Sequence, residues 1–161
     1  MLIRPAQPDD AAVLHQFILD LAEDENFPEP VPAQAQNVAT ALFGPRAVAE
    51  AVVAEIDAKP AGFALFYPTY STILGRPGIH LEDLYVRPEH RGRGLGRALL
   101  AHLAELVIER GGGRLEWWVL RTNEPALRFY SGLHARELDE LTVQRLDGPA
   151  LHRLATAPKW I

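Results

Sequence analysis

The chain has 161 residues, of which 48% are hydrophobic and none is cysteine, so we expect one domain over residues 1–161 with a core that needs no disulfide or metal. The lack of cysteine excludes a thiol nucleophile and fits a reducing cytoplasm. A net charge of −5 argues against a nucleic-acid binder, and without an apolar run of about 18 residues or a signal pattern neither membrane insertion nor secretion is expected.

Hydrophobic periodicity predicts strands and helices in alternation along the chain. In chain order we expect a strand at 2–4, a helix from 9 or 10, a loop at 23–32, a weaker helix at 33–43, strands at 51–56 and 61–67, a loop at 69–78, a strand at 79–86, a helix from 95 to about 110, a strand at 115–120, a helix at 123–130, a strand at 137–146 and a helical turn at 148–155. Together they predict an α/β fold, with a mixed sheet of six to seven strands flanked by about four helices.

The most informative segment is LEDLYVRPEHRGRGLG, residues 81–96, in which a strand enters a glycine- and arginine-rich loop before the long helix. Glycines let a backbone approach a ligand closely, and a helix N-terminus attracts anions, so the loop predicts a diphosphate cradle. The loop lacks the Gly-Lys-Ser/Thr of a P-loop, and Arg97 stands where a dinucleotide fingerprint has its third glycine. The pattern that remains is Arg91-x-x-Gly94-x-Gly96, with Arg93 as a further positive charge.

A second pattern follows the strand expected at 115–120. Asn123 and Pro125 predict the start of a short helix, because Asn caps helices and Pro fits the first turn, and this helix ends in Phe129-Tyr130. The order strand, RxxGxG, helix, strand, Asn-x-Pro, helix, Phe-Tyr resembles the GNAT superfamily of acyl-CoA-dependent N-acyltransferases. Over nearly the whole chain it is most similar to the diamine (spermidine/spermine and thialysine) acetyltransferase branch.

The resemblance implies a GNAT-like single domain that transfers acetyl from acetyl-CoA to a primary amine of a small cationic molecule, directly and in a ternary complex. It assigns cofactor binding to the end of the strand, the loop and the second pattern, namely Leu84, Tyr85, Val86, Arg91, Gly92, Arg93, Gly94, Leu95, Gly96, Arg97, Asn123 and Tyr130. The backbone of 84–86 would bond the amide-rich pantetheine arm. One N–H of this strand would face the thioester oxygen, a donor worth roughly 3 kcal/mol.

Two residues are expected to move protons. Tyr130 is the expected general acid, because a phenol with a pKa near 10 can protonate a departing thiolate. Glu82 is the expected base, which takes a proton from the amine directly or through a water. Since Glu82 and Asp83 are adjacent in a strand, we expect them to face opposite sides of the sheet, and the resemblance selects Glu82.

Four acidic residues are expected to bind the acceptor: Asp24, Glu25, Glu82 and Asp83. In the diamine branch, the loop after the N-terminal helix carries an acidic residue that meets the second cationic end of the substrate, and Glu25 matches it. Asp24 and Asn26 stand where tyrosines are common, which separates this chain from the branch. The alternative reading of Asp24 and Glu25 is a solvated acidic loop.

His134 stands where a glycine usually follows the Phe-Tyr pair, so we expect a turn residue that adopts a left-handed conformation at some cost. The other histidines lack ligand-like spacing, so no metal is expected. Trp117 and Trp118 should face opposite ways, one of them into the core.

The expected partners are a small-molecule amine and, by resemblance, a second copy in a homodimer. Two alternatives stay open at this point. One is acetylation of a protein N-terminus or a drug amine, and the other is a non-catalytic acyl-CoA-binding regulatory module.

Overall fold

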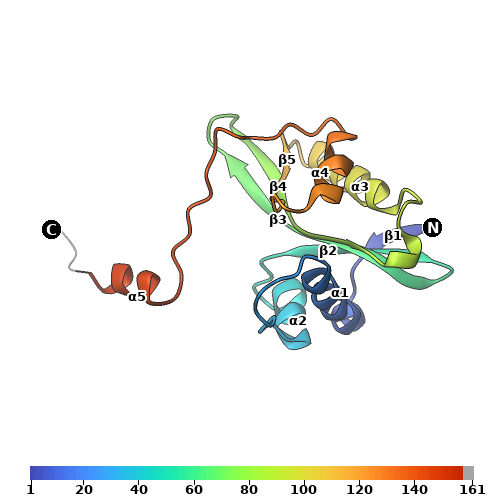
Figure 1. Cartoon of the computed structure of the whole chain (residues 1–161), viewed down its shortest axis with the longest axis horizontal. Coiled ribbons are helices and arrows are strands. Elements are labelled where there is room, and N and C mark those ends of the chain that lie inside the picture. The colour runs from blue at the N-terminus through green and yellow to red at the C-terminus, as the bar shows by residue number, and fades with distance from the viewer. Residues whose placement is uncertain (158–161) are drawn as a thin grey trace. The chain divides into compact units, whose positions relative to one another are not determined.

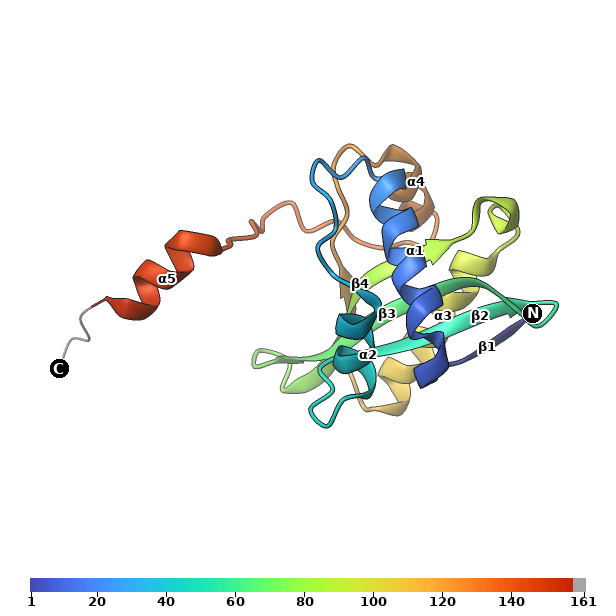
Figure 2. The same ribbon diagram turned by 90° about the horizontal axis from the view of Figure 1, so that it is seen from below.

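A five-stranded mixed β-sheet organises the first 120 residues of the chain. The computed structural model describes residues 1–157, which divide into two units, Met1–Leu120 and the part from Arg121 onward. The strands are β1 (Leu2–Pro5), β2 (Glu50–Ile56), β3 (Lys59–Ser71), β4 (Arg76–Val86) and β5 (Leu115–Trp117). They lie in the order β1-β2-β3-β4-β5 (Figures 1 and 2); the first four are antiparallel and β5 runs parallel to β4.

Helices cover both faces of this sheet. On one face lie α1 (Ala11–Asp24) and α2 (Ala35–Phe43), and α3 (Leu95–Glu109) lies on the other (Figure 2). Under α1, the rings of Phe17, Phe63 and Tyr85 pack together in a buried cluster. These layers confirm the expected α/β architecture and mixed sheet.

The strand β4 carries a bulge at the middle of its pairing with β3. Asp83 pairs with Leu65, whereas the next residue of β3, Phe66, pairs with Leu81, so Glu82 is the extra residue. A bulge places two residues opposite one and breaks the strict alternation of side chains. On its other side, β4 pairs with β5 only from Ile79 to Leu81.

One predicted loop and one predicted strand differ from the structure in the first unit. The expected loop at 69–78 is mostly strand, because β3 and β4 continue as a hairpin to Ser71 and from Arg76. The expected strand at 115–120 is limited to Leu115–Trp117. In both cases pairing with the neighbouring strand decides the element, and single-strand periodicity does not contain that information.

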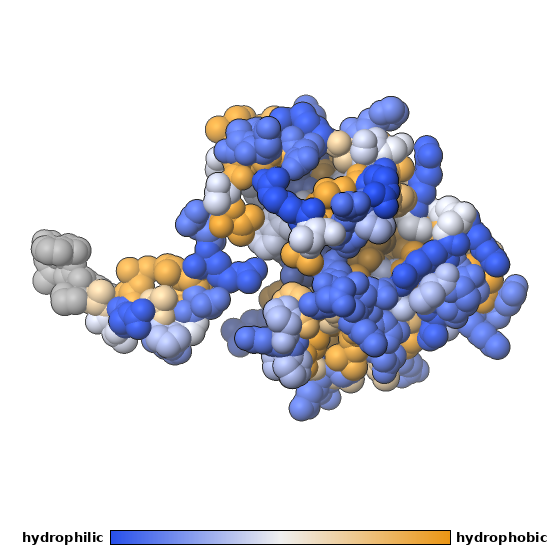
Figure 3. Space-filling view, viewed as in Figure 1, coloured by the Kyte–Doolittle hydropathy of each residue, from blue (hydrophilic) through white to orange (hydrophobic). Residues whose placement is uncertain are grey.

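The unit from Arg121 onward contains α4 (Glu124–Ser131) and α5 (Gly148–Thr156). The prediction of a strand at 137–146 was wrong, since no regular strand occurs there, so the described sheet has five strands rather than six or seven. An alternating pattern gives a strand only where a neighbour offers its hydrogen-bonding edge. The helical turn expected at 148–155 is confirmed as α5, which makes five α-helices instead of about four. Hydrophobic side chains lie on the surface of α5 (Figure 3).

Glycine and histidine end two of the helices in left-handed conformation. The N–H of Gly112 bonds Val107 O at 2.7 Å, and Gly111, with a φ of 68°, ends α3. After α4, the N–H of Ala135 bonds Tyr130 O at 3.2 Å, and His134 occupies the left-handed position with a φ of 60°. Both ends are Schellman motifs, and the conformation predicted for His134 is confirmed.

Candidate active site

The loop between β4 and α3 has the geometry of an anion cradle. Gly92 and Gly94 adopt φ values of 71° and 86°, which side chains other than glycine's rarely adopt, and nothing lies within 4 Å of a Cβ built on either. The first hydrogen bond of α3 runs from Ala98 N to Gly94 O at 2.9 Å, and no side chain caps the helix. The N–H groups of the first turn of α3, residues 95–97, have no acceptor within the helix. They are therefore available to a diphosphate.

The side chain of Arg91 connects this loop to the end of β4 and to α1. Its Nε donates to Val86 O at 2.7 Å, its guanidinium lies 5.4 Å from the centre of the Tyr85 ring, and its Nη2 pairs with Asp24 at the end of α1. The ion pair joins the end of α1 to the loop between β4 and α3. Because the guanidinium is engaged in this way, the loop offers backbone N–H groups, rather than the Arg91 side chain, as its main anion donors.

The end of β4 offers unpaired backbone on the side away from β3. Since β5 pairs with β4 only as far as Leu81, the following residues 82–86 have no strand partner on that side within the described chain. An amide-rich ligand can add to such an edge by backbone hydrogen bonds, as an extended peptide does. The Tyr85 side chain is buried in the α1 core and donates to Asp20 at 3.3 Å, so Tyr85 can serve such a ligand only through its backbone.

The bulge brings Glu82 and Asp83 to the same face of the sheet, which corrects the expectation that they face opposite sides. Asp83 lies on the α1 face, since its partner Leu65 packs against the core under α1. Glu82 interacts with Tyr67, which lies two residues beyond Leu65 on that face. Adjacent residues alternate in a regular strand, but not across a bulge.

Three carboxylates share this region. Asp83 is half-buried, and burial, followed by the negative charges of Glu82 and then Glu25, raises the pKa of its carboxyl to about 6. Glu25 is the C-cap that follows α1, where the helix dipole adds negative potential. The structure therefore brings together Glu25, Glu82 and Asp83 of the four predicted acceptor residues, while Asp24 pairs with Arg91.

An aromatic cluster beside Glu82 escaped the sequence analysis. The ring of His80 stacks on Tyr67 at 5.0 Å and meets Trp118 edge-on at 4.9 Å, and its Nε2 lies 3.8 Å from Glu82 Oε2. The sequence analysis considered these histidines only as metal ligands and gave His80 no role. The spacing of His80 and Glu82, two residues apart in a strand, was the signal that could have placed both on one face. The expectation that one of the two tryptophans is a core residue was wrong: Trp117 is half-buried and Trp118 is 59% exposed.

The second predicted pattern forms the helix α4 as expected. Asn123 is its N-cap, and its side-chain oxygen accepts from Ala126 N at 3.2 Å, with Pro125 in the first turn. Tyr130 lies in the last turn, where its ring packs against Phe129 at 5.2 Å. Because the hydrophobic packing and the phenol hydroxyl use different parts of the side chain, this contact is compatible with an acid role.

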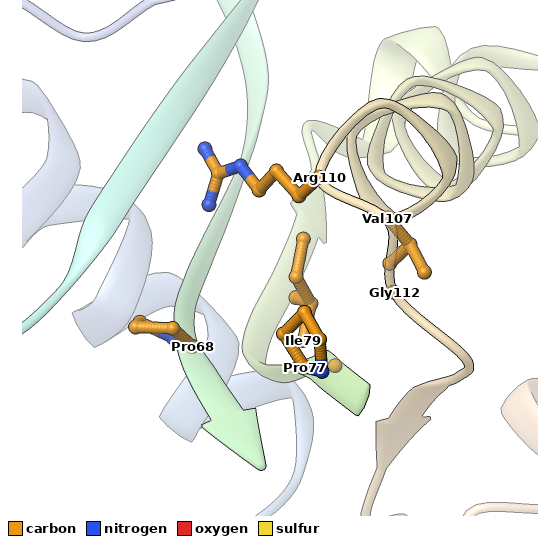
Figure 4. Close-up of a pocket in the computed structure, with 7 residues that line it drawn as sticks. Pro68, Pro77, Ile79, Val107, Arg110 and Gly112 are labelled. Atoms are coloured by element: carbon orange, nitrogen blue, oxygen red, sulfur yellow. The ribbon is translucent and has the colours of Figure 1, made fainter. Parts of the chain in front are cut away.

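A small apolar hollow lies on the α3 face, away from the loop. Figure 4 shows Pro68, Pro77 and Ile79 of the β3–β4 hairpin on one side of it and Val107, Arg110 and Gly112 of the α3 end on the other. Since α3 has 15 residues, this end lies about 22 Å from the phosphate loop. Within residues 1–157 there is no metal-ligating cluster, and no helix there could span a membrane.

The chain is an α/β domain with two features next to each other. The end of β4 has an unpaired edge that suits an amide-rich ligand arm, and the glycine loop at the N-terminus of α3 suits a diphosphate. The family model described as the acetyltransferase (GNAT) family matches residues 15–134, and the chain belongs to this family. It is thus an acetyltransferase, and family membership implies an acyl-CoA donor.

Curated relatives match over almost the full length. The thialysine N-epsilon-acetyltransferase of Bos taurus is 33% identical over 96% of this chain and 97% of its own, and that of Caenorhabditis elegans is 38% identical over 92% of each. Among solved structures, an integron cassette protein from the mobile metagenome of V. cholerae matches with a TM-score of 0.81 at 25% identity. That match covers 97% of this chain and 98% of the other.

Proposed function

We propose that this acetyltransferase transfers acetyl from acetyl-CoA to a primary amine of a small molecule with a second positive charge, such as thialysine or a polyamine. The observation that carries the proposal is the group of three carboxylates, Glu25, Glu82 and Asp83, on the α1 face next to the open edge of β4. Repulsion and burial raise the pKa of Asp83, and a bound dication would relieve both. Relatives named for thialysine acetylation support the same substrate class.

The donor would bind along two elements of the first unit. The N–H groups of residues 92–97 and the N-terminus of α3 receive the diphosphate, while the backbone of Leu84–Val86 bonds the pantetheine arm. One N–H of the same strand faces the thioester oxygen, where negative charge develops during attack. Such an oriented donor is worth roughly 3 kcal/mol in the transition state.

The chemistry needs a neutral amine and a protonated leaving thiolate. At pH 7.5 a lysine-like ammonium with a pKa near 10.4 is almost fully charged, and its deprotonation costs about 4 kcal/mol. Glu82 accepts that proton, the amine nitrogen attacks the thioester carbon, and the carbon–sulfur bond breaks. Tyr130 gives its phenol proton to the departing sulfur, and the proton that the nitrogen loses as the amide forms restores the phenol. Transfer is direct, because the chain has no cysteine to hold an acyl-enzyme.

We also propose a homodimer. Leu141, Val143 and Leu146 are exposed in the segment before α5, and Leu151 and Leu154 are exposed on α5 itself. A second copy that covers these side chains would remove them from water, at about 25 cal/mol for each Å² buried. Light scattering during gel filtration tests this, and a monomer at micromolar concentration would contradict it.

A thiol-release assay with acetyl-CoA and a panel of amines tests the proposed function. We expect turnover with thialysine, spermidine or a related diamine. Turnover limited to a peptide N-terminus would overturn the substrate class and retain the acetyltransferase.

A further inference from the structure

The carboxylate of Glu82 lies beside the aromatic cluster Tyr67–His80–Trp118, to which the proposed function gives no task. Pairing places these residues together. Tyr67 of β3 is the cross-strand partner of His80. On its other side His80 pairs with Glu116 of β5, and Trp118 follows Glu116 by two residues. Residues two apart in a strand share a face, so the three rings and Glu82 meet on one face.

The His80 ring is held more firmly than the carboxylate that it faces. His80 is 7% exposed and lies between the stacked Tyr67 ring and the edge-on Trp118 ring. The Glu82 side chain is 48% exposed, and its Oε2 lies 3.8 Å from His80 Nε2. This distance is too long for a hydrogen bond, and a small rotation about the side-chain bonds of the exposed glutamate would close it.

Tyr67 and His80 face the same carboxylate. Burial, then the charge of Glu82 and a hydrogen bond to it, raise the pKa of the Tyr67 hydroxyl. The other ionisable groups near this carboxylate are acidic: Asp83 on β4 and, through Asp83, Glu25 at the end of α1. On β5, Glu116 pairs with Arg114 at 2.8 Å. Thus Tyr67 and His80 both present a donor to Glu82, and Asp83 repels it.

We propose that His80 is a positioning residue for Glu82: with Nε2 protonated, it holds the carboxylate, together with the Tyr67 hydroxyl, in the orientation that receives the proton of the amine. The inference rests on the proposed function, because it requires Glu82 to be the base. A flexible exposed glutamate visits several rotamers, and catalysis gains when a reacting group is fixed in place. The imidazole itself touches neither the amine nor the thioester.

Two substitutions separate the Nε2 donor from the ring. His80→Phe keeps a ring between Tyr67 and Trp118 and removes the donor, whereas His80→Gln keeps an N–H near the Nε2 position. We expect His80→Phe to lower kcat/KM for the amine about 10- to 100-fold while KM for acetyl-CoA changes less than about twofold. His80→Gln should recover most of that loss. Equal losses in the two variants would overturn the inference.

A double-mutant cycle with Glu82→Gln tests whether His80 acts through Glu82. In the Glu82→Gln background, His80→Phe should cost almost nothing further, because no carboxylate remains to be positioned. A merely structural role would cost the same in both backgrounds and would contradict the inference. If Glu82→Gln alone keeps the wild-type rate, the base assignment of the proposed function fails, and the positioning role fails with it.

Stability controls separate a loss of activity from a loss of folding. Melting temperatures report whether the buried His80→Phe variant folds. If it does not, Tyr67→Phe removes the second donor without changing the ring, and its loss in kcat/KM should also vanish in the Glu82→Gln background. Tyr70→Phe, an exposed tyrosine on the same strand, is the matched control and should behave as wild type. A wild-type rate for Tyr67→Phe, or a loss for Tyr67→Phe that is as large in the Glu82→Gln background as in the wild type, would overturn the inference.

Discussion

Glu82 and Asp83 are neighbours in the chain and nevertheless face the same side of the sheet, because the bulge in β4 inserts Glu82 beside the Asp83–Leu65 pair. Together with Glu25 they concentrate negative charge at the end of α1, and the pKa of Asp83 rises to about 6 in consequence of burial and of these two charges. The arrangement opposes folding in the absence of a cation and favours binding in its presence.

Asp83→Asn should therefore stabilise the protein at neutral pH. A carboxyl with a folded pKa near 6 and an unfolded pKa near 3.8 binds more protons when folded, so wild-type stability falls as pH rises from about 4 to about 6. The variant lacks this fall and should gain up to about 3 kcal/mol at pH 7.5 and only about 1 kcal/mol at pH 4.5. Urea unfolding at both pH values measures the difference. Asp9→Asn, at an exposed site, is the control, and an equal gain at both pH values would contradict the account.

Gly94→Val should abolish stabilisation by acetyl-CoA. A ligand at a hundredfold excess over its Kd stabilises the native state by about 2.7 kcal/mol, and a side chain at Gly94 would occupy the cradle. Gly75→Val is the matched control, since Gly75 also has a positive φ of 63° and an open Cβ position, in the β3–β4 turn. Both variants carry the same kind of backbone strain, so only the loss in Gly94→Val reports ligand contact. Thermal shifts that fall equally in both would argue against the loop.

Tyr130→Phe should lower kcat about 100-fold with nearly unchanged affinity for acetyl-CoA, because the phenol proton is needed when the thiolate leaves and not for binding. Single-turnover rates and equilibrium titration separate the two quantities. A variant that keeps over half of the wild-type single-turnover rate would show that Tyr130 is not the acid.

His134→Gly should increase the free energy of unfolding by about 0.5–1 kcal/mol. The residue holds the left-handed position of the Schellman motif after α4, at a φ of 60°, which glycine adopts without a Cβ penalty. His134→Ala is the control and should give no gain, because alanine keeps the Cβ. Equal stability of the glycine and alanine variants in denaturant would contradict this reading.

The parts of the fold that local chemistry dictates were predictable from the sequence. Glycines mark the loop before α3 and the end of α3, and Asn123 with Pro125 marks the start of α4. The bulge at Glu82 was not predictable, because it depends on how β3 and β4 align and leaves no mark in the periodicity of β4. The expectation of opposite faces for Glu82 and Asp83 failed for that reason.

Long-range pairing explains the other differences. The length of the β3–β4 hairpin and the shortness of β5 follow from which edges meet, and the pattern at 137–146 has strand periodicity but no strand in the structure. The His80 cluster likewise joins three strands or their extensions, so only the cross-strand register reveals it. The roles of Tyr130 and Glu82 as acid and base remain predictions.

The ratio of kcat/KM for thialysine or spermidine to that for a monoamine of matched length tests the central claim most directly. The account predicts a preference of at least about tenfold in the wild-type protein, since a partly buried carboxylate pair exceeds the roughly 0–1 kcal/mol of an exposed one. Glu25→Gln should reduce that preference several-fold, while Glu23→Gln, an exposed neighbour, should leave it unchanged. Equal turnover of the monoamine and the diamines by the wild-type protein would contradict the claim and leave only the acetyltransferase class.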